Sequence, residues 1–210
     1  MSISTAIAQA RGPGRPRSLA SEEAILDATM QILAREGYGG LTTDKIAALA
    51  KASKSTIYRR WPSKEHMVLA AFDRSPPLEP KNSDDLLNDL LDIVMQLVDL
   101  IRQTPLGGAL PALVFERSHN AQLAEALDPV IERRREPTKA ILRSAILRGD
   151  LPKNTDLELA VDLIWGPVIL RTIFTPGDVS IGALRTLLAV VVSGLIHGPV
   201  PLRIGGAHGV

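Results

Sequence analysis

The segment 42–64 constrains the fold more than any other part of the chain, because its apolar spacing fits two short helices joined by a tight bend. Ile46, Leu49 and Ala50 recur at the i, i+3 and i+4 spacing of one buried helix face. Only the residues 51–53 separate this helix from the next one. A connection that short is typical of a helix-turn-helix, in which two helices cross at a steep angle.

The second helix, expected over 54–60, has one apolar residue and a broad polar face. Thr42 and Ser53 are predicted to cap the two helices. Ile57 is predicted to pack against the first helix, which leaves a polar set facing outward: Lys54, Ser55, Thr56, Tyr58, Arg59 and Arg60. Such donors, with one aromatic ring, suit base edges and phosphate oxygens of DNA. The plainer interpretation is a solvated basic surface, and the pattern alone leaves both open.

Five short sequence blocks around this segment occur together in one known family. They are Leu41-Thr42, Ile46-Ala47, Ser53-Lys54, Thr56-Ile57-Tyr58-Arg59 and Pro62-Ser63-Lys64-Glu65. Through them, residues 21–73 resemble the N-terminal domain of the TetR family of transcriptional regulators. The resemblance implies a homodimeric repressor that binds a palindromic operator and is released by a small molecule.

The resemblance and the outward donors together predict a set of DNA contacts. We expect base contacts from Lys54 and Arg59 and phosphate contacts from Tyr58, Arg60 and Lys64. Lys64 is expected at a helix N-terminus, where backbone N–H groups favour a phosphate. The full predicted set is Thr42, Thr43, Lys54, Ser55, Thr56, Tyr58, Arg59, Arg60 and Lys64.

Some residues depart from the family pattern. Lys51 occupies the turn position where the family usually has glycine, and a positive φ there would cost about 1 kcal/mol. We therefore expect the turn to adopt another conformation. Arg60 and Trp61 stand where histidine and phenylalanine are frequent in the family. Arg60 can still contact a phosphate, and Trp61 still places an aromatic ring at the end of the helix.

Composition favours an all-α protein. We expect about nine helices in all, in an N-terminal three-helix helix-turn-helix domain and a larger C-terminal helical regulatory domain. Apolar residues make up 45% of the 210 residues but aromatic residues only 3%, and few stretches alternate between apolar and polar. Residues 1–75 carry eleven Lys and Arg against seven Asp and Glu, whereas residues 76–210 carry thirteen against sixteen. The positive charge therefore lies with the predicted DNA-binding segment.

The N-terminal residues 1–20 are predicted to be a disordered basic arm, because glycine and proline alternate there with Arg11, Arg15 and Arg17. The run Gly14-Arg15-Pro16-Arg17 resembles the core of an AT-hook, whose arginines enter a narrow minor groove. A solubilising tail is the alternative. Ser21 is the expected N-cap of the first helix, and Gly37 its expected end.

The proline-rich segment 75–82 is predicted to separate a DNA-binding domain, 21–75, from a larger helical domain, 83–198, that precedes a flexible tail, 199–210. The larger domain is expected to contain five helices. Their expected limits are Leu86 to just before Pro105, a short helix to Ser118, a kinked one to Arg148, one from a Thr155/Glu158 capping box to Phe174, and one over Ser180–His197.

The last two of these helices are apolar on nearly every face. A helix of that kind must be buried on all sides. Because they end a small domain, the simplest cover for the extra face is a second copy of the chain, which predicts a homodimer through a four-helix bundle. The family resemblance implies the same arrangement.

An effector site is predicted near the few aromatic residues of the larger domain. Phe115, Trp165 and Phe174 are the candidates, because Gly166-Pro167 should distort its helix and open space. The alternative is that these rings only fill the core. A protein without such a cavity would instead be a constitutive, architectural DNA-binding protein with no ligand input.

Other functions find little support in the sequence. No phosphate-binding glycine loop or His-Glu-x-x-His motif occurs, cysteine is absent, and the four histidines are scattered, so we expect no enzyme activity, metal or cofactor. The run Leu187–Ile196 is too short to span a bilayer, and residues 1–10 lack a charged leader pattern. These features predict a cytoplasmic protein that does not bind membranes.

Overall fold

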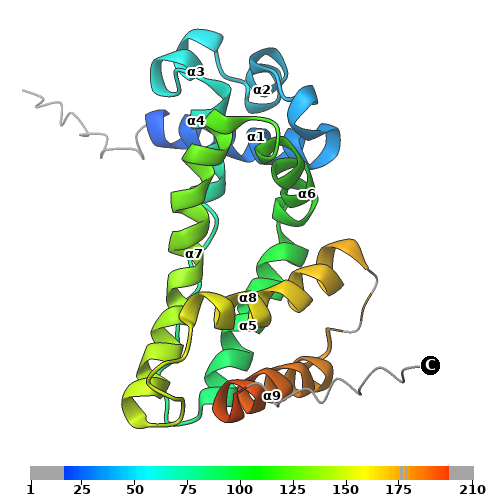
Figure 1. The fold of residues 1–210 in the computed structure, drawn as a ribbon. Helices are drawn as coiled ribbons and strands as arrows, with labels where there is room; N and C mark the ends of the chain where they lie inside the picture. Colours follow the sequence, from blue (N-terminus) through cyan, green and yellow to red (C-terminus); the bar gives the residue numbers. More distant parts are fainter. Residues whose placement is uncertain (1–16, 176, 178, 199–210) are drawn as a thin grey trace, which may run out of the picture.

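The computed structural model describes residues 17–175, 177 and 179–198, and this part of the chain contains nine α-helices and no strand. Helices α1 to α4 gather at one end of the molecule, and α9 lies at the opposite end (Figure 1). The first group comprises α1 (Arg17–Gly40), α2 (Thr43–Ala50), α3 (Lys54–Arg60) and α4 (Lys64–Asp73). The body comprises α5 (Leu86–Gln103), α6 (Leu106–Arg117), α7 (Ala121–Arg148), α8 (Leu157–Ile169) and α9 (Ile181–His197).

The first helix starts earlier than the sequence suggested. It begins at Arg17, so Ser21 lies inside it and is not its N-cap, and residues 17–20 belong to the helix rather than to the arm. The residues that break helices end at Pro16, which explains where the helix can begin. Gly37 interrupts the helix with φ 69° and ψ −177°, as expected of a glycine at a helix end.

The helix-turn-helix forms as predicted at its caps and its core. The side chains of Thr42, Ser53 and Ser63 accept hydrogen bonds from the first turns of α2, α3 and α4. Ile46 and Ile57 are fully buried, which fixes the crossing of α2 and α3. The bend between these helices is therefore held by side-chain caps and by one apolar contact region.

The expected alternative conformation of the turn is wrong. Lys51 adopts φ 51° and ψ 41°, the left-handed conformation that the family's glycine would adopt without strain. In this conformation the N–H of Ala52 donates to the carbonyl of Ala47 at 3.0 Å, and the N–H of Lys51 donates to that of Ala48 at 3.4 Å. These hydrogen bonds close the end of α2 and oppose the local strain.

The helices of the body follow the predicted limits closely. Helix α5 ends at Gln103, just before Pro105, and α6 ends at Arg117. Helix α7 continues through Pro129 and Pro137 as one element, so packing of its buried apolar face outweighs the backbone hydrogen bonds that proline cannot make. Helix α6 packs against α1 and α7 packs against α4, so two body helices contact the helix-turn-helix group.

The start of α8 differs from the predicted capping box. Asp156, rather than Thr155, is the N-cap, and its carboxylate accepts from the N–H of Leu159 at 3.1 Å. The Thr155 hydroxyl instead donates to the carbonyl of Pro152 at 2.7 Å. Glu158 is drawn away from the helix end because it accepts a hydrogen bond from Lys139 of α7 at 2.5 Å.

A single π-helical turn, Leu170–Phe174, follows α8. The N–H of Thr175 donates to the carbonyl of Leu170 at 2.9 Å, which is the i+5 pattern of a π-turn. The sequence predicted a distortion at Gly166-Pro167, and the structure has it from Leu170 onward, after α8 has continued through that pair to Ile169.

The segment 75–82 crosses between the two parts of the chain without regular secondary structure. Leu78 is buried, and the backbone of Glu79 exchanges two hydrogen bonds with the Gln96 amide, at 2.8 and 3.0 Å. The segment is therefore fixed along α5 rather than free.

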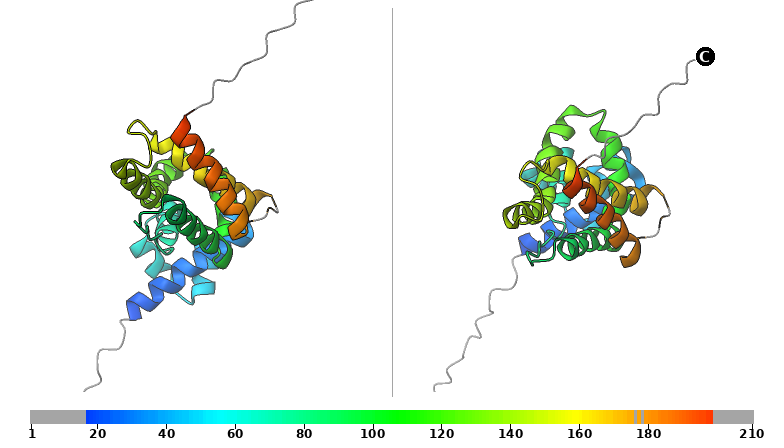
Figure 2. Two further views of the ribbon diagram at one scale, coloured as in Figure 1. Left: turned by 90° about the horizontal axis from the view of Figure 1, so that it is seen from below. Right: turned by 60° about the horizontal axis from the view of Figure 1, so that its bottom comes forward.

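Helices α8 and α9 carry apolar side chains that one chain does not cover. Leu159, Leu163, Val190 and Ile196 are exposed, although Ala160, Val161, Ile164, Leu184 and Leu188 on the inner faces are buried. Figure 2, viewed from the α9 end, shows α9 as the outermost helix there. Within the described residues, no helix is long and apolar enough to cross a bilayer.

Candidate DNA interface and effector cavity

Helix α3 presents its predicted polar side chains at the outer end of the molecule. Lys54, Ser55, Tyr58 and Arg59 are exposed, and Thr56 is half-buried. Within the described part of the chain, Arg59 makes no hydrogen bond or ion pair, so its guanidinium keeps all its donors for an external acceptor. The hydroxyls of Ser55 and Thr56 instead share hydrogen bonds with Ser53 at 2.9 and 2.8 Å.

Two further residues of the predicted set, Lys54 and Thr42, already have partners. Lys54 forms an ion pair with Asp44 of α2, and this contact raises the pKa of the lysine. Thr42 is exposed and its hydroxyl caps α2, whereas Thr43 is half-buried in the first turn. A DNA phosphate near Lys54 would have to replace the Asp44 carboxylate.

The two cations predicted to bind phosphate at the edge of α3 contact α1 instead. Arg60 forms an ion pair with Glu22 and is half-buried. Lys64 donates to the backbone carbonyl of Tyr38 and lies 3.8 Å from the centre of its ring. Burial lowers the pKa of Lys64, against the opposing effect of Glu116 and Glu65. Of the predicted arm contacts, Arg15 lies outside the described residues, and Arg17 is the first residue of α1.

Tyr38 and Glu65 form a polar contact that the sequence analysis missed. The Tyr38 hydroxyl donates to Glu65 Oε1 at 2.5 Å and joins the end of α1 to the first turn of α4. Hydrogen bonds from Ser63 and Tyr38 lower the pKa of Glu65 to about 2. Burial and the same contact raise the pKa of Tyr38 above its usual value. The only local feature of the sequence that bears on this contact is the position of Glu65 in the first turn of a predicted helix.

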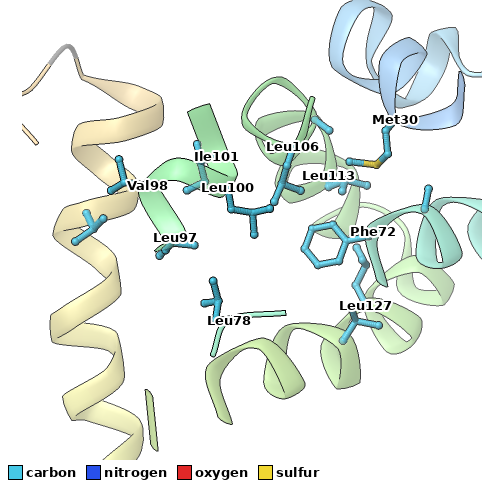
Figure 3. Packing of buried hydrophobic residues seen from close by; sticks show 14 of the residues in the cluster. Met30, Phe72, Leu78, Leu97, Val98, Leu100, Ile101, Leu106, Leu113 and Leu127 are labelled. Carbon is cyan, nitrogen blue, oxygen red and sulfur yellow. The ribbon is translucent and has the colours of Figure 1, made fainter. Parts of the chain in front are cut away.

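A largely apolar cavity of about 430 Å³ lies in the body of the molecule, within the usual size of small-molecule sites. Figure 3 shows several of its lining residues from close by, among them Phe72, Leu78, Leu97, Leu100, Ile101 and Leu106. Its wall comes from the end of α4, the segment 75–82, helices α5 to α8 and the π-turn. The cavity therefore reaches from the body to the helix that follows α3.

Two of the three predicted aromatic residues line this cavity, and the third does not. Trp165 and Phe174 belong to the wall, and Trp165 Nε1 donates to the Thr138 hydroxyl at 3.1 Å. The prediction for Phe115 is wrong: it is 67% exposed and packs against the His119 ring at 4.9 Å between centroids. Its neighbour Val114 lines the cavity, because successive helical residues point about 100° apart.

Three charged residues border the cavity, and the sequence analysis did not identify them. Arg135 is paired with Asp162 at 2.6 Å and with Glu158 at 3.2 Å. Arg134 instead donates to backbone carbonyls: Phe72 at 3.0 Å, Ser75 at 2.6 Å and Pro76 at 2.5 Å. Arg134 thereby joins α7 to the end of α4 and to the segment 75–82.

These features define a class of protein: a helix-turn-helix DNA-binding protein whose reading helix is attached to a helical body with an apolar cavity. The comparison with known families narrows the class. Residues 25–71 match the family model described as bacterial regulatory proteins, tetR family, and residues 80–191 match the tetracyclin repressor-like C-terminal domain. The chain belongs to the TetR family of transcriptional regulators.

Relatives with curated descriptions extend over most of the chain. It is 32% identical over 190 residues to the uncharacterized HTH-type transcriptional regulator YdeS of Bacillus subtilis, covering 87% of this chain and 93% of the relative. It is also 32% identical to the DNA-binding transcriptional repressor TetR of Mycobacteroides abscessus, covering 67% of this chain and 75% of the relative.

Solved structures share the same fold. The crystal structure of the TetR family transcription regulator SCO0332 superimposes with a TM-score of 0.62 at 27% identity, covering 86% of this chain and 99% of that one. A TetR-family structure from Rhodococcus sp. reaches a TM-score of 0.69 at 16% identity, covering 85% and 99%. The second likeness shows the fold alone.

Proposed function

We propose that this regulator is a homodimeric repressor that binds a palindromic operator and is released by a small, mostly apolar effector. The observation that carries the proposal is the apolar cavity whose wall includes Phe72 of α4, the helix that directly follows the reading helix α3. An effector in this cavity would contact the element that connects the two parts of the protein. The Mycobacteroides abscessus relative is a DNA-binding transcriptional repressor, which supports repression as the role of this protein. We propose that this protein is located in the cytoplasm.

We propose that DNA recognition is divided between two kinds of contact. Lys54 and Arg59 would read base edges, and Tyr58 and Lys64 would hold phosphates, with Arg60 joining them when its ion pair with Glu22 opens. The hydroxyls of Thr42, Thr43, Ser55 and Thr56 would supply further donors. The free guanidinium of Arg59 supports its role in base reading.

The division of roles can be tested with one operator and one random duplex, the operator being selected from a random-sequence library by the protein itself. Arg59→Ala should weaken operator binding by about 1–3 kcal/mol and random binding little. Lys64→Ala should weaken both duplexes alike, since a phosphate contact carries no sequence information. Equal losses on both duplexes from Arg59→Ala would contradict the assignment of base reading to this residue.

We propose that α8 and α9 form the dimer interface. Their exposed apolar side chains, among them Leu159, Leu163 and Val190, would be buried against the same helices of a second copy. Two reading helices would then lie on one side of the dimer and meet successive major grooves.

Effector release can be tested by coupling a thermal-shift screen to operator binding. A ligand that binds only the folded state raises the melting temperature of the protein. A ligand that lowers operator affinity must also bind the operator complex more weakly than the free protein, because the two binding free energies are linked. We expect compounds that raise the melting temperature to lower operator affinity. If cavity ligands are found and none changes operator affinity, the constitutive architectural function becomes the better explanation.

We also propose that the basic arm binds the minor groove beside each half-site. Arg17 begins α1, so residues 11–16 directly precede a helix of the DNA-binding end. A double substitution, Arg11→Gln with Arg15→Gln, should reduce the salt dependence of binding by about 0.9 for each phosphate that the arm no longer neutralises. An unchanged salt slope would show that the arm does not contact DNA.

A further inference from the structure

Arg134 links the cavity to the DNA-binding end of the chain through hydrogen bonds that involve no carboxylate. Its guanidinium donates to the carbonyls of Phe72 and Ser75 at 3.0 and 2.6 Å and to that of Pro76 at 2.5 Å. The last turn of α4 and the start of the segment 75–82 supply these oxygens. Arg134 therefore acts as a cap for the end of α4, supplied by α7.

The charge of Arg134 is not balanced at the cavity wall. Within the described residues, no carboxylate oxygen lies within 4.0 Å of its guanidinium, whereas the neighbouring Arg135 is neutralised by Asp162 and Glu158. The charged residues of the cavity wall are Arg134, Arg135 and Asp162, which together carry one net positive charge. An arginine stays protonated at ordinary pH, so a net positive charge faces a mainly apolar space.

Burial makes the charge of Arg134 costly. Arg134 is half-buried, and burial lowers the pKa of its guanidinium, with Asp73 opposing the shift. The ring of Phe72 also lies near, 5.7 Å from the guanidinium carbon. The hydrogen-bond acceptors of Arg134 are neutral carbonyls, and a carboxylate or phosphate in their place would add the attraction of a full negative charge.

We propose that the effector is an apolar molecule with an anionic group, and that Arg134 binds this group in exchange for the carbonyls at the end of α4. The inference rests on the proposed effector-release function and names the chemical class of the effector. The apolar lining would hold the body of the molecule, and Arg134 would orient its carboxylate or phosphate end.

If Arg134 bound an anion in place of the α4 carbonyls, the DNA-binding end would lose hydrogen bonds that hold it to α7. Without Arg134, the carbonyls of Phe72, Ser75 and Pro76 lose their side-chain donor, so the end of α4 and the following segment are freer to move. Helix α4 packs against α1, and α1 packs against α2 of the helix-turn-helix. Binding of an anion would therefore alter the contact of α4 with α7 and, through α1, the position of α3.

The experiment compares three probes that share one chain length and differ in their end group: decanoate, decanol and decylammonium. Dissociation constants for the full-length protein are measured by calorimetry, and operator affinity is measured with and without each probe. We expect decanoate to bind about tenfold or more tightly than decanol, from one charge-assisted contact, and decylammonium to bind most weakly. Decanoate should also lower operator affinity the most.

Two variants test whether Arg134 causes this preference. Arg134→Gln should bind decanoate no better than decanol, whereas Arg134→Lys should retain a reduced preference because it keeps the charge and loses the fork geometry. The matched control is Arg133→Gln. Arg133 is adjacent on α7 and 60% exposed, and it pairs with Asp73 at 2.5 Å without lining the cavity. The control should keep the full preference for decanoate.

The outcomes separate this inference from the proposed function. Decanol binding as tightly as decanoate, a preference that survives Arg134→Gln, or no binding of any probe would overturn the anionic class. If decanoate is preferred through Arg134 but operator affinity stays unchanged with every probe, the release function fails. Partial unfolding of Arg134→Gln, seen by circular dichroism, would leave Arg134→Lys and Arg133→Gln to decide the result.

Discussion

Lys51 carries a backbone conformation that suits glycine better than lysine. Its φ of 51° is the only positive value for a non-glycine residue in the described chain. A side chain in this conformation costs the folded state about 1–2 kcal/mol. Glycine removes that cost, but its more flexible unfolded chain lowers the free energy of unfolding by about 0.4–1 kcal/mol. We therefore predict that Lys51→Gly raises the free energy of unfolding by about 0.5–1 kcal/mol, measured by chemical denaturation.

The control for Lys51 is a glycine introduced at an ordinary helical position. Ala48 is exposed inside α2, so Ala48→Gly should lower the free energy of unfolding by about 1 kcal/mol. If both substitutions destabilise the protein equally, Lys51 is not strained.

The contact between Tyr38 and Glu65 predicts a loss of stability in acid. The folded-state pKa of Glu65 is about 2, below its ordinary value of 4.5. Glu65 therefore stabilises the fold fully above about pH 4.5, and this contribution is lost as the pH falls toward 2. Tyr38→Phe removes one of the hydrogen bonds that lower this pKa, so the folded-state pKa should rise and the acid loss should become shallower.

This prediction is checked by nuclear magnetic resonance titration of the Glu65 carboxyl group and by denaturation across the acid range. The Glu65→Gln variant has no carboxylate to titrate, so its stability should lack this component in both the wild-type and the Tyr38→Phe backgrounds. An identical Glu65 pKa in wild type and Tyr38→Phe would show that the tyrosine does not stabilise the ionised carboxylate.

At the scale of helices, local sequence predicted most of the fold because caps and prolines act locally. Thr42 and Ser53 cap helices where the sequence placed them, and α5 ends just before Pro105. It failed at α8, where Thr155 and Asp156 are both good caps and tertiary partners of Glu158 decide between them. It also failed at Phe115, because the rotation of α6 about its axis depends on the helices around it.

Helices α1 and α6 approach closely at a glycine. A Cβ added at Gly108 would lie 3.0 Å from the Cβ of Ala34 and 3.2 Å from its carbonyl oxygen. We predict that Gly108→Val separates α6 from α1 and destabilises the protein by about 1–3 kcal/mol, as overpacking does elsewhere. Thermal unfolding measures the effect.

The control for Gly108 is a glycine that also lies near a helix start. A Cβ added at Gly182 of α9 has nothing within 4 Å. Gly182→Val should therefore change stability by less than about 0.5 kcal/mol, as surface substitutions do. A similar small effect at Gly108 would mean that the two helices can separate freely.

At the scale of the whole molecule, the sequence indicated a division of the chain into two parts but not how they are joined. The apolar faces and the charge difference between the halves indicated a DNA-binding end and a helical body. The bonds from Arg134 to Phe72 and Ser75 join residues about sixty positions apart. No local pattern marks such a pair, since its meeting depends on the packing of α7 against α4.

The proposed dimer gives the last prediction. Leu163 lies on the outer face of α8 and is 43% exposed in one chain, so a charge there should be tolerated by the folded chain but not by an apolar interface. We predict that Leu163→Glu remains folded, becomes monomeric by light scattering, and binds a full operator no more tightly than a single half-site. Wild type should bind the full operator far more tightly, because one dimer engages both half-sites.

The control is Leu147→Glu, at a position near the end of α7 that is 88% exposed. This variant should stay dimeric and bind the operator as wild type does. A dimeric Leu163→Glu with unchanged operator affinity would place the interface elsewhere on the body.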